Sequence, residues 1–149
     1  MITPILKPKK ETKAEKLARK KAKHKLTKGF YNQQVKKLEK ECDKLWSLKV
    51  REKCRCELCG RTGDIKGFDA HHLIGRGHKA TRWDLNNGAC LCKGDHRFKV
   101  HQDTFTAAIL FEKLKDKRGY SWFDNLYILK NQIFNPTRAY LEDIIKSLS

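Results

Sequence analysis

The chain has 149 residues and a formal net charge of +17, from 34 Lys and Arg against 17 Asp and Glu. This length suits one domain with an extension, and the charge favours a polyanion or an anionic membrane surface as partner. The sequence contains no run of roughly 18 apolar residues that would span a bilayer. The first ten residues lack the apolar stretch of a signal peptide, so we expect a cytoplasmic protein.

Residues 1–30 form the most basic stretch, with eleven Lys or Arg and two Glu. Large apolar side chains are scarce after Leu6, so this segment buries little surface by itself. Glu, Lys, Ala and Leu predominate over residues 11–23 and predict patches of helix. We interpret residues 1–30 as a flexible basic arm that becomes ordered when it binds phosphates.

Residues 31–53 are expected to form a helix that opens the folded domain, residues 31–149. Apolar side chains recur there at three- and four-residue steps and make a single stripe: Val35, Leu38, Cys42, Leu45 and Trp46. Because Cys42 belongs to this stripe, we interpret it as a small buried apolar side chain and not as a metal ligand.

Residues 54–101 contain frequent glycines, a pattern typical of tight turns and short strands. We expect a strand over residues 67–74 that ends in the pair His71–His72. Residues 88–92 are expected to form a second strand or a turn into a helix that begins near Asp95. With the flanking helices, this pattern predicts an α+β fold.

Residues 102–149 are expected to be helical. Asp103 or Thr104 can cap a helix that stops near Gly119, and a second helix covers residues 120–132. Asn135-Pro136 is a start signal for the last helix, with Asn as the cap and Pro at the first helical position. The apolar side chains expected to pack in the core are Phe105, Ile109, Leu110, Leu114, Trp122, Phe123, Leu126, Tyr127, Leu129, Leu141, Ile144, Ile145 and Leu148.

Six cysteines are present: Cys42, Cys54, Cys56, Cys59, Cys90 and Cys92. The charge, the missing signal peptide and the clustered spacing favour reduced thiols and zinc over disulfides. Cys56-x2-Cys59, followed by Gly60, has the spacing of a zinc knuckle, and Cys92-x2-Asp95 offers a second pair with the same spacing. Asp95 is the first choice for the fourth ligand, followed by Cys90 or Cys54 and then water. A site that has lost its ion is a further alternative.

The segment around residues 69–96 contains the residue types that phosphodiester hydrolysis requires. A neutral histidine can take a proton from water, and a divalent ion can stabilise the phosphoryl oxygens and the leaving oxygen. Neighbouring residues of a strand point to opposite faces, so His71 and His72 can serve the ion and the water separately at a strand end. His96 can fold back across the hairpin from the start of its helix, and Asn87 can orient His72 or its loop.

These residues resemble a known family. The segment from Cys56 to His101 is similar to the HNH endonuclease superfamily, which has a ββα-metal fold. Asp69-Ala70-His71-His72 and Asn86-Asn87-Gly88 resemble phage recombination endonucleases of the NinG/Rap type. The ending Leu91-Cys92-x-x-Asp95-His96, together with a basic N-terminal arm, resembles nucleases of the Ref type. The resemblance covers about a third of the chain and implies a small ββα-metal core with a zinc knuckle, flanked by helices.

The resemblance implies a role for each matching residue. His72 takes the place of the general base, His71 and His96 take the places of catalytic metal ligands, and Asn87 takes the place of the middle Asn. His101 is an additional ligand or a phosphate contact. The implied catalytic ion is Mg²⁺ or Mn²⁺, and the implied products carry 5′-phosphates. The flanking side chains His78, Lys79 and Arg82, with His101, are candidate DNA-backbone contacts.

Other functions are compatible with parts of this pattern. A non-catalytic zinc-knuckle module would bind nucleic acid without needing His71, His72, His96 and Asn87 together. RNA is an alternative substrate that nothing in the sequence excludes. A membrane-surface protein is disfavoured, because the arm lacks the Trp, Phe and Leu face of interfacial helices. Cutting both strands would favour a homodimer. A recombinase partner and a role in phage recombination, in the host-cell cytoplasm, rest on the resemblance alone.

Overall fold

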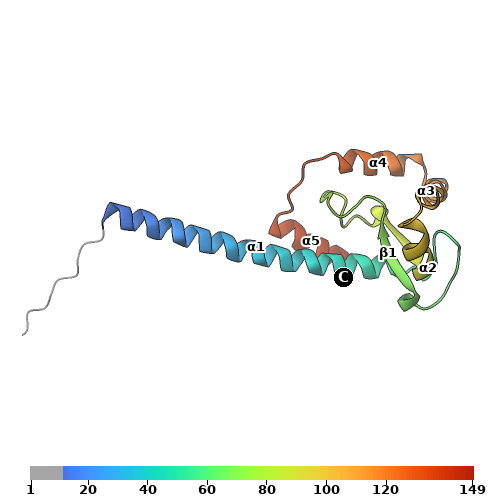
Figure 1. The fold of residues 1–149 in the computed structure, drawn as a ribbon, viewed down its shortest axis with the longest axis horizontal. Coiled ribbons are helices and arrows are strands. Elements are labelled where there is room, and N and C mark those ends of the chain that lie inside the picture. Colours follow the sequence, from blue (N-terminus) through green and yellow to red (C-terminus); the bar gives the residue numbers. More distant parts are fainter. Residues whose placement is uncertain (1–11) are drawn as a thin grey trace, which may run out of the picture. The chain divides into compact units, whose positions relative to one another are not determined.

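The computed structural model describes residues 12–149. Its first helix, α1 (Lys13–Arg51), belongs to two structural units that meet between Lys36 and Lys37 (Figure 1). The helix predicted over residues 31–53 therefore starts earlier, at Lys13, and ends at Arg51. Residues 1–11 of the predicted arm lie outside the described residues.

Residues 13–36 form one continuous helix where patches of helix were expected. Thr12 Oγ1 accepts a hydrogen bond from the Glu15 amide at 3.2 Å, and Glu15 Oε2 accepts one from the Thr12 amide at 2.7 Å. This reciprocal pair is a capping box, which satisfies free amides at a helix start. Eight Lys or Arg and one Glu fall within residues 13–30, so the basic charge is carried on a formed helix.

The second unit, Lys37–Ser149, is built around one antiparallel hairpin. β1 (Phe68–His72) pairs with β2 (Gly88–Cys92), and the register places His72 opposite Gly88 and Phe68 opposite Cys92. The 3-10 turns η1 (Ile65–Gly67) and η2 (Leu85–Asn87) lead into the two strands. The strand predicted over residues 67–74 is present but shorter, at Phe68–His72, and of the two alternatives predicted for residues 88–92 the strand is the one observed.

Helices complete the second unit and give an α+β fold, as predicted. Short α2 (Lys93–Asp95) continues into a π-helical turn, η3 (His96–Val100). It is followed by α3 (Thr104–Arg118), α4 (Tyr120–Lys130) and α5 (Arg138–Leu148). Asp103 caps α3 as predicted, and Gly119 follows it with φ of +86°. No helix among residues 12–149 combines the length and the apolar character needed to cross a membrane.

Two details of the helical predictions are wrong. The cap of α5 is Thr137, whose hydroxyl accepts a hydrogen bond from the Tyr140 amide at 3.2 Å, so Asn135 and Pro136 precede the helix. On α3, Leu110 and Leu114 are buried, but Phe105 is 80% exposed and Ile109 is 51% exposed. On α4, Tyr127, which was also predicted to pack in the core, is 53% exposed. Asp103 sets where the helix begins, while the neighbouring elements select which face of it is covered.

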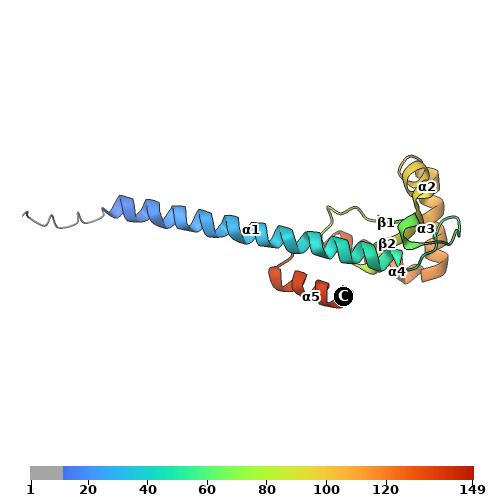
Figure 2. The same ribbon diagram turned by 90° about the horizontal axis from the view of Figure 1, so that it is seen from below.

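The core of this unit lies between the end of α1, the hairpin and α5. Figures 1 and 2 both show α5 beside the C-terminal part of α1. Cys42 is fully buried there, and its Sγ contacts the Leu141 carbonyl oxygen at 3.5 Å. Burial raises the pKa of the Cys42 thiol to about 11, which confirms that Cys42 is a core residue.

Gly88 allows α1 to approach the hairpin closely. A Cβ atom at this position would lie 2.5 Å from Val50 Cγ2 and 3.0 Å from Trp46 Cζ2. Both neighbours are buried side chains of α1, so neither can move away into solvent. The missing side chain of Gly88 is therefore a packing requirement.

We expect Gly88→Ala to lower the free energy of unfolding by about 1–3 kcal/mol, the usual penalty for overpacking a core. Denaturant unfolding followed by circular dichroism measures this change. The matched control is Gly67→Ala, because a Cβ atom at Gly67 has open space around it. Equal stability of the two variants would contradict the packing argument.

Candidate active site and metal centre

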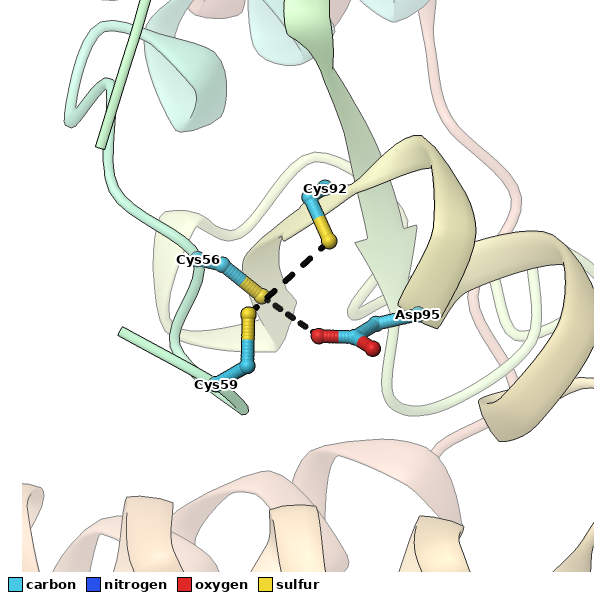
Figure 3. Close-up of side chains that lie close together, drawn as sticks. All are labelled: Cys56, Cys59, Cys92 and Asp95. Carbon is cyan, nitrogen blue, oxygen red and sulfur yellow. Dashed lines mark hydrogen bonds between the residues drawn. The ribbon is translucent and has the colours of Figure 1, made fainter. Parts of the chain in front are cut away.

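Cys56, Cys59, Cys92 and Asp95 come together in a single cluster (Figure 3). Each offers one ligand atom, and these atoms all lie within 4.8 Å of one another. The first two residues come from the turn after α1, Cys92 ends β2, and Asp95 ends α2. This arrangement joins the two sequence pairs as predicted and forms a group that can hold a metal ion.

Asp95 is suited to act as the oxygen ligand of this cluster. It is 3% exposed, and its Oδ2 accepts a hydrogen bond from the Cys56 thiol at 3.2 Å. Lys99 Nζ lies 2.6 Å from its Oδ1. Burial opposes ionisation, but hydrogen bonds from Cys59, Lys99 and Cys56 hold the pKa of Asp95 well below its usual range. The carboxylate is therefore charged, as a ligand must be.

The alternative fourth ligands lie outside the cluster. Cys90 is fully buried in β2, where it pairs with Ala70. Cys54 does not belong to either group of candidate ligands in the described residues. The geometry thus favours Asp95 over both cysteines.

A second group consists of His71, His96 and His101, whose ligand nitrogens also lie within 4.8 Å of one another. His71 is on β1, His96 opens the π-helical turn, and His101 follows it. The Nε2 atoms of His96 and His101 are 3.1 Å apart. His101, whose role the sequence left open between ligand and phosphate contact, thus lies with the two other histidines of this candidate group.

Asp69 fixes the orientation of His96. Its Oδ2 lies 3.1 Å from His96 Nδ1, and a carboxylate can only accept, so Nδ1 carries the proton. The lone pair of His96 is then on Nε2, the nitrogen that faces His101. Asp69 reaches this position because it lies two residues before His71 and shares its face of the strand. Such a carboxylate behind a histidine is typical of metal sites.

His71 is held neutral by its surroundings. Burial, together with the neighbouring His96 and His101, lowers its pKa to about 4. A neutral imidazole keeps a lone pair for a metal ion, whereas an imidazolium has none. His71 is therefore in a state that can bind a cation near neutral pH.

His72 is held apart from this group by two contacts. Its ring stacks on Trp46 of α1, with ring centroids 3.7 Å apart and an interplanar angle of 16°. Its Nε2 lies 2.9 Å from the Arg82 carbonyl oxygen. Because a carbonyl only accepts, Nε2 carries the proton and the lone pair of the neutral ring is on Nδ1. Burial lowers the pKa of His72, which favours this neutral form.

Asp43 of α1 holds the backbone that contacts His72. Its Oδ1 accepts from Arg82 Nε at 2.9 Å and from Trp83 Nε1 at 2.8 Å, and its Oδ2 accepts from Arg82 Nη2 at 2.6 Å. The Arg82 carbonyl thus has a fixed position. This role could not be predicted from residue spacing, because Asp43 is distant from the histidines along the chain.

One pocket of about 380 Å³ brings both kinds of histidine together. Its lining includes His71, His96 and His101 and also His72 and Trp46. The pocket lies across the end of β1, where the pairing of the strands stops at His72 and Gly88. A single ligand in this pocket can therefore contact the metal-binding group and His72 at the same time.

Asn87 is fully buried and acts on the loop after β1. Its Oδ1 accepts from the Ile74 amide at 2.7 Å, and its Nδ2 donates to the carbonyl oxygens of Ile74 at 2.9 Å and Thr81 at 3.0 Å. These contacts fix residues 74–81, the loop that leads to Arg82. The sequence left open whether Asn87 orients His72 or its loop, and the hydrogen bonds of its side chain are to the loop.

Three predicted phosphate contacts are engaged within the fold. Lys79 Nζ lies 2.6 Å from Glu39, and Arg82 pairs with Asp43 as described. His78 Nδ1 lies 3.1 Å from the Lys130 carbonyl oxygen. The charges of Lys79 and Arg82 are thus balanced by acids of α1, and their predicted contact with a DNA backbone stays a prediction.

Comparison with protein-family models, with curated proteins and with solved structures gave no match for this chain. The residues and their geometry are therefore the basis for assigning a function.

We expect Asn87→Ala to destabilise the protein by about 1–3 kcal/mol, because the Ile74 amide loses its partner in a partly buried position. Amide hydrogen exchange at Ile74 should accelerate together with the drop in unfolding free energy. Asn86→Ala is the matched control, since the Asn86 side chain is exposed and the contacts to this residue use its backbone. Unchanged exchange at Ile74 in Asn87→Ala would contradict this role.

Proposed function

We propose that this protein is a metal-dependent endonuclease of the HNH type that hydrolyses phosphodiester bonds in DNA. The observation that carries the proposal is the shared pocket at the end of β1. Three histidine nitrogens converge there on one position, and a fourth histidine, His72, faces the same pocket from outside that group. A binding module has no use for a separately held neutral histidine beside a cation site.

In this proposal His72 is the general base. Its Nε2–H is bound to the Arg82 carbonyl, so Nδ1 takes the proton from the attacking water. The stacked Trp46 keeps the ring in place, and Asp43 and Asn87 fix the backbone on which His72 depends. Asn87 is accordingly a positioning residue, because it contacts the loop and not the pocket.

His71, His96 and His101 are the residues that would hold the divalent ion. Such an ion stabilises negative charge on the phosphoryl and leaving oxygens. The donor set consists of imidazole nitrogens, which suit transition metals, whereas Mg²⁺ prefers oxygen ligands. Of the two ions implied by the resemblance, Mn²⁺ is therefore the better match to these residues.

The cysteine cluster is proposed to be a structural zinc site. Three thiolates and one carboxylate provide four ligands, the number that zinc takes in closed structural sites. The cluster links the end of α1 to the strand and helix that carry His96, so bound zinc would stabilise the fold of the candidate active site.

The basic helix before Lys36 is proposed to contact the DNA backbone, because eight Lys or Arg against one Glu fall within residues 13–30 and their side chains are exposed. Binding should then weaken steeply as salt concentration rises. A recombinase partner, a homodimer, RNA as an alternative substrate, and a role in phage recombination in the host cytoplasm remain predictions from the sequence.

Cys92→Ala should remove the zinc bound at the cysteine cluster and lower the thermal midpoint, since the metal contributes directly to folding. Metal analysis after dialysis and a melting curve measure both effects. Cys42→Ala is the control, because it also removes a buried thiol but lies outside the cluster. Full zinc content in Cys92→Ala would contradict the assignment.

His72→Ala should lose about 10²–10⁴-fold in cleavage rate, the usual contribution of a general base, while DNA binding and metal content stay unchanged. The measurement is cleavage of single-stranded DNA, duplex DNA, a four-way junction and RNA, with Mn²⁺ and with Mg²⁺. Products should carry 5′-phosphates, and Mn²⁺ should support the faster reaction. Ser47→Ala, which alters the same pocket without removing a titratable group, is the control. Binding without cleavage by the unmodified protein on every substrate would favour the non-catalytic zinc-knuckle module.

A further inference from the structure

A second pocket is lined by the cysteine turn, residues 56–60. Its volume is about 650 Å³, and it shares no lining residue with the histidine pocket. Four cationic side chains also line it: Lys53, Arg55, Lys113 and Lys117. The one acidic side chain of its lining is Glu57.

These cations come from separate elements that fold together around one site. Lys53 and Arg55 follow α1, whereas Lys113 and Lys117 lie on α3. Lys113 Nζ donates to the Leu58 carbonyl oxygen at 2.8 Å, which ties α3 to the cysteine turn. Positive side chains distant in sequence therefore meet at a concave surface.

Glu57 is a buried carboxylate that contacts several of these cations. Its side chain is 4% exposed. Its Oε2 accepts from the Cys90 amide at 2.9 Å, and Arg118 Nη2 lies 3.0 Å from its Oε1. Lys53 Nζ also donates to its two oxygens, each at 3.1 Å, and Lys117 Nζ lies 3.8 Å away. A buried carboxylate that holds several cations fixes their positions, and this lowers the entropy lost when they bind a ligand.

The pocket has more positive charge than its neighbouring negative groups can balance. Glu57 supplies one negative charge, and Arg118 already pairs with it from outside the pocket lining. A divalent ion held by three thiolates and Asp95 would add two negative charges. The four lining cations outnumber these three negative charges together. Lys117 and Lys53 also remain accessible, with side chains 67% and 42% exposed.

We propose that this pocket binds a phosphate group of the nucleic-acid backbone at a position away from the cleavage site. The proposal rests on the proposed nuclease function and adds a second anchoring point for the substrate strand. Lys and Arg that contact phosphates position a nucleic acid without reading its sequence. The pocket therefore fixes how the substrate lies across the cysteine turn.

Salt-dependent binding of a DNA duplex tests this proposal. Every protein carries His72→Ala, so that the DNA stays intact, and affinity is measured by fluorescence anisotropy at several salt concentrations. Arg55→Gln with Lys117→Gln should reduce the magnitude of the slope of log affinity against log salt by about 0.9, since the pocket is proposed to contact one phosphate and each lost phosphate contact changes the slope by about 0.9. Lys44→Gln with Lys146→Gln removes the same charge from exposed positions outside the pocket and should leave the slope unchanged. Both pairs lie at the surface, and zinc content reports whether the cysteine turn stays intact.

The outcomes separate the two proposals. An unchanged slope in the pocket pair, with normal binding by the parent protein, would overturn the phosphate pocket alone. Loss of zinc with an unchanged slope would mean that these cations support the metal cluster. That result would also overturn the phosphate pocket. Absence of salt-dependent binding in all the proteins would overturn the nucleic-acid substrate as well. A parallel titration with inorganic phosphate follows the NMR resonances of the amides of residues 57–60. If phosphate shifts these resonances while the salt slope of DNA binding is unchanged in the pocket pair, the pocket is a site for small free anions instead.

Discussion

The close contact between Trp46 and the end of the hairpin is the constraint on which the rest of the candidate site depends. Trp46 stacks on His72, and its Nε1 donates to the Asp84 carbonyl oxygen at 2.9 Å. Gly88 leaves the room that this approach needs. One side chain of α1 thus sets both the position of the helix against the hairpin and the orientation of the proposed base. A change in this packing would alter the position of the proposed base directly, because the His72 ring stacks on Trp46.

Asp95 and His96 connect the two groups of metal ligands through a single peptide bond. Asp95 faces the cysteine cluster, and His96 faces the three-histidine group. Both sit at the junction of α2 and the π-helical turn, which directly follows β2. A rigid cysteine cluster would therefore hold the backbone from which His96 projects. This geometry gives the proposed structural zinc a role in organising the active site in addition to its contribution to stability.

The sequence predicted those features that depend on local spacing. The Cys-x2-Cys and Cys-x2-Asp pairs, the strand ending in His71–His72 and the cap at Asp103 follow from short-range rules. The true start of α1 was also locally encoded, in Thr12-x-x-Glu15, but the absence of an apolar stripe before residue 31 obscured it. The contacts of Asp43, Trp46 and Asp69 with the site were not predictable, because they arise from tertiary packing between segments far apart in the chain.

Burial provides the chemical state that both histidine roles require. A metal ligand and a general base each need a neutral imidazole, and partial burial lowers the pKa of both His71 and His72. The Arg82 carbonyl opposes this shift at His72, since it also stabilises the protonated ring. The same hydrogen bond nevertheless fixes which nitrogen carries the lone pair. His72 therefore keeps a free Nδ1 over a wider pH range than an exposed histidine would. Because its pKa is lowered, its neutral imidazole is also a weaker base than that of an exposed histidine.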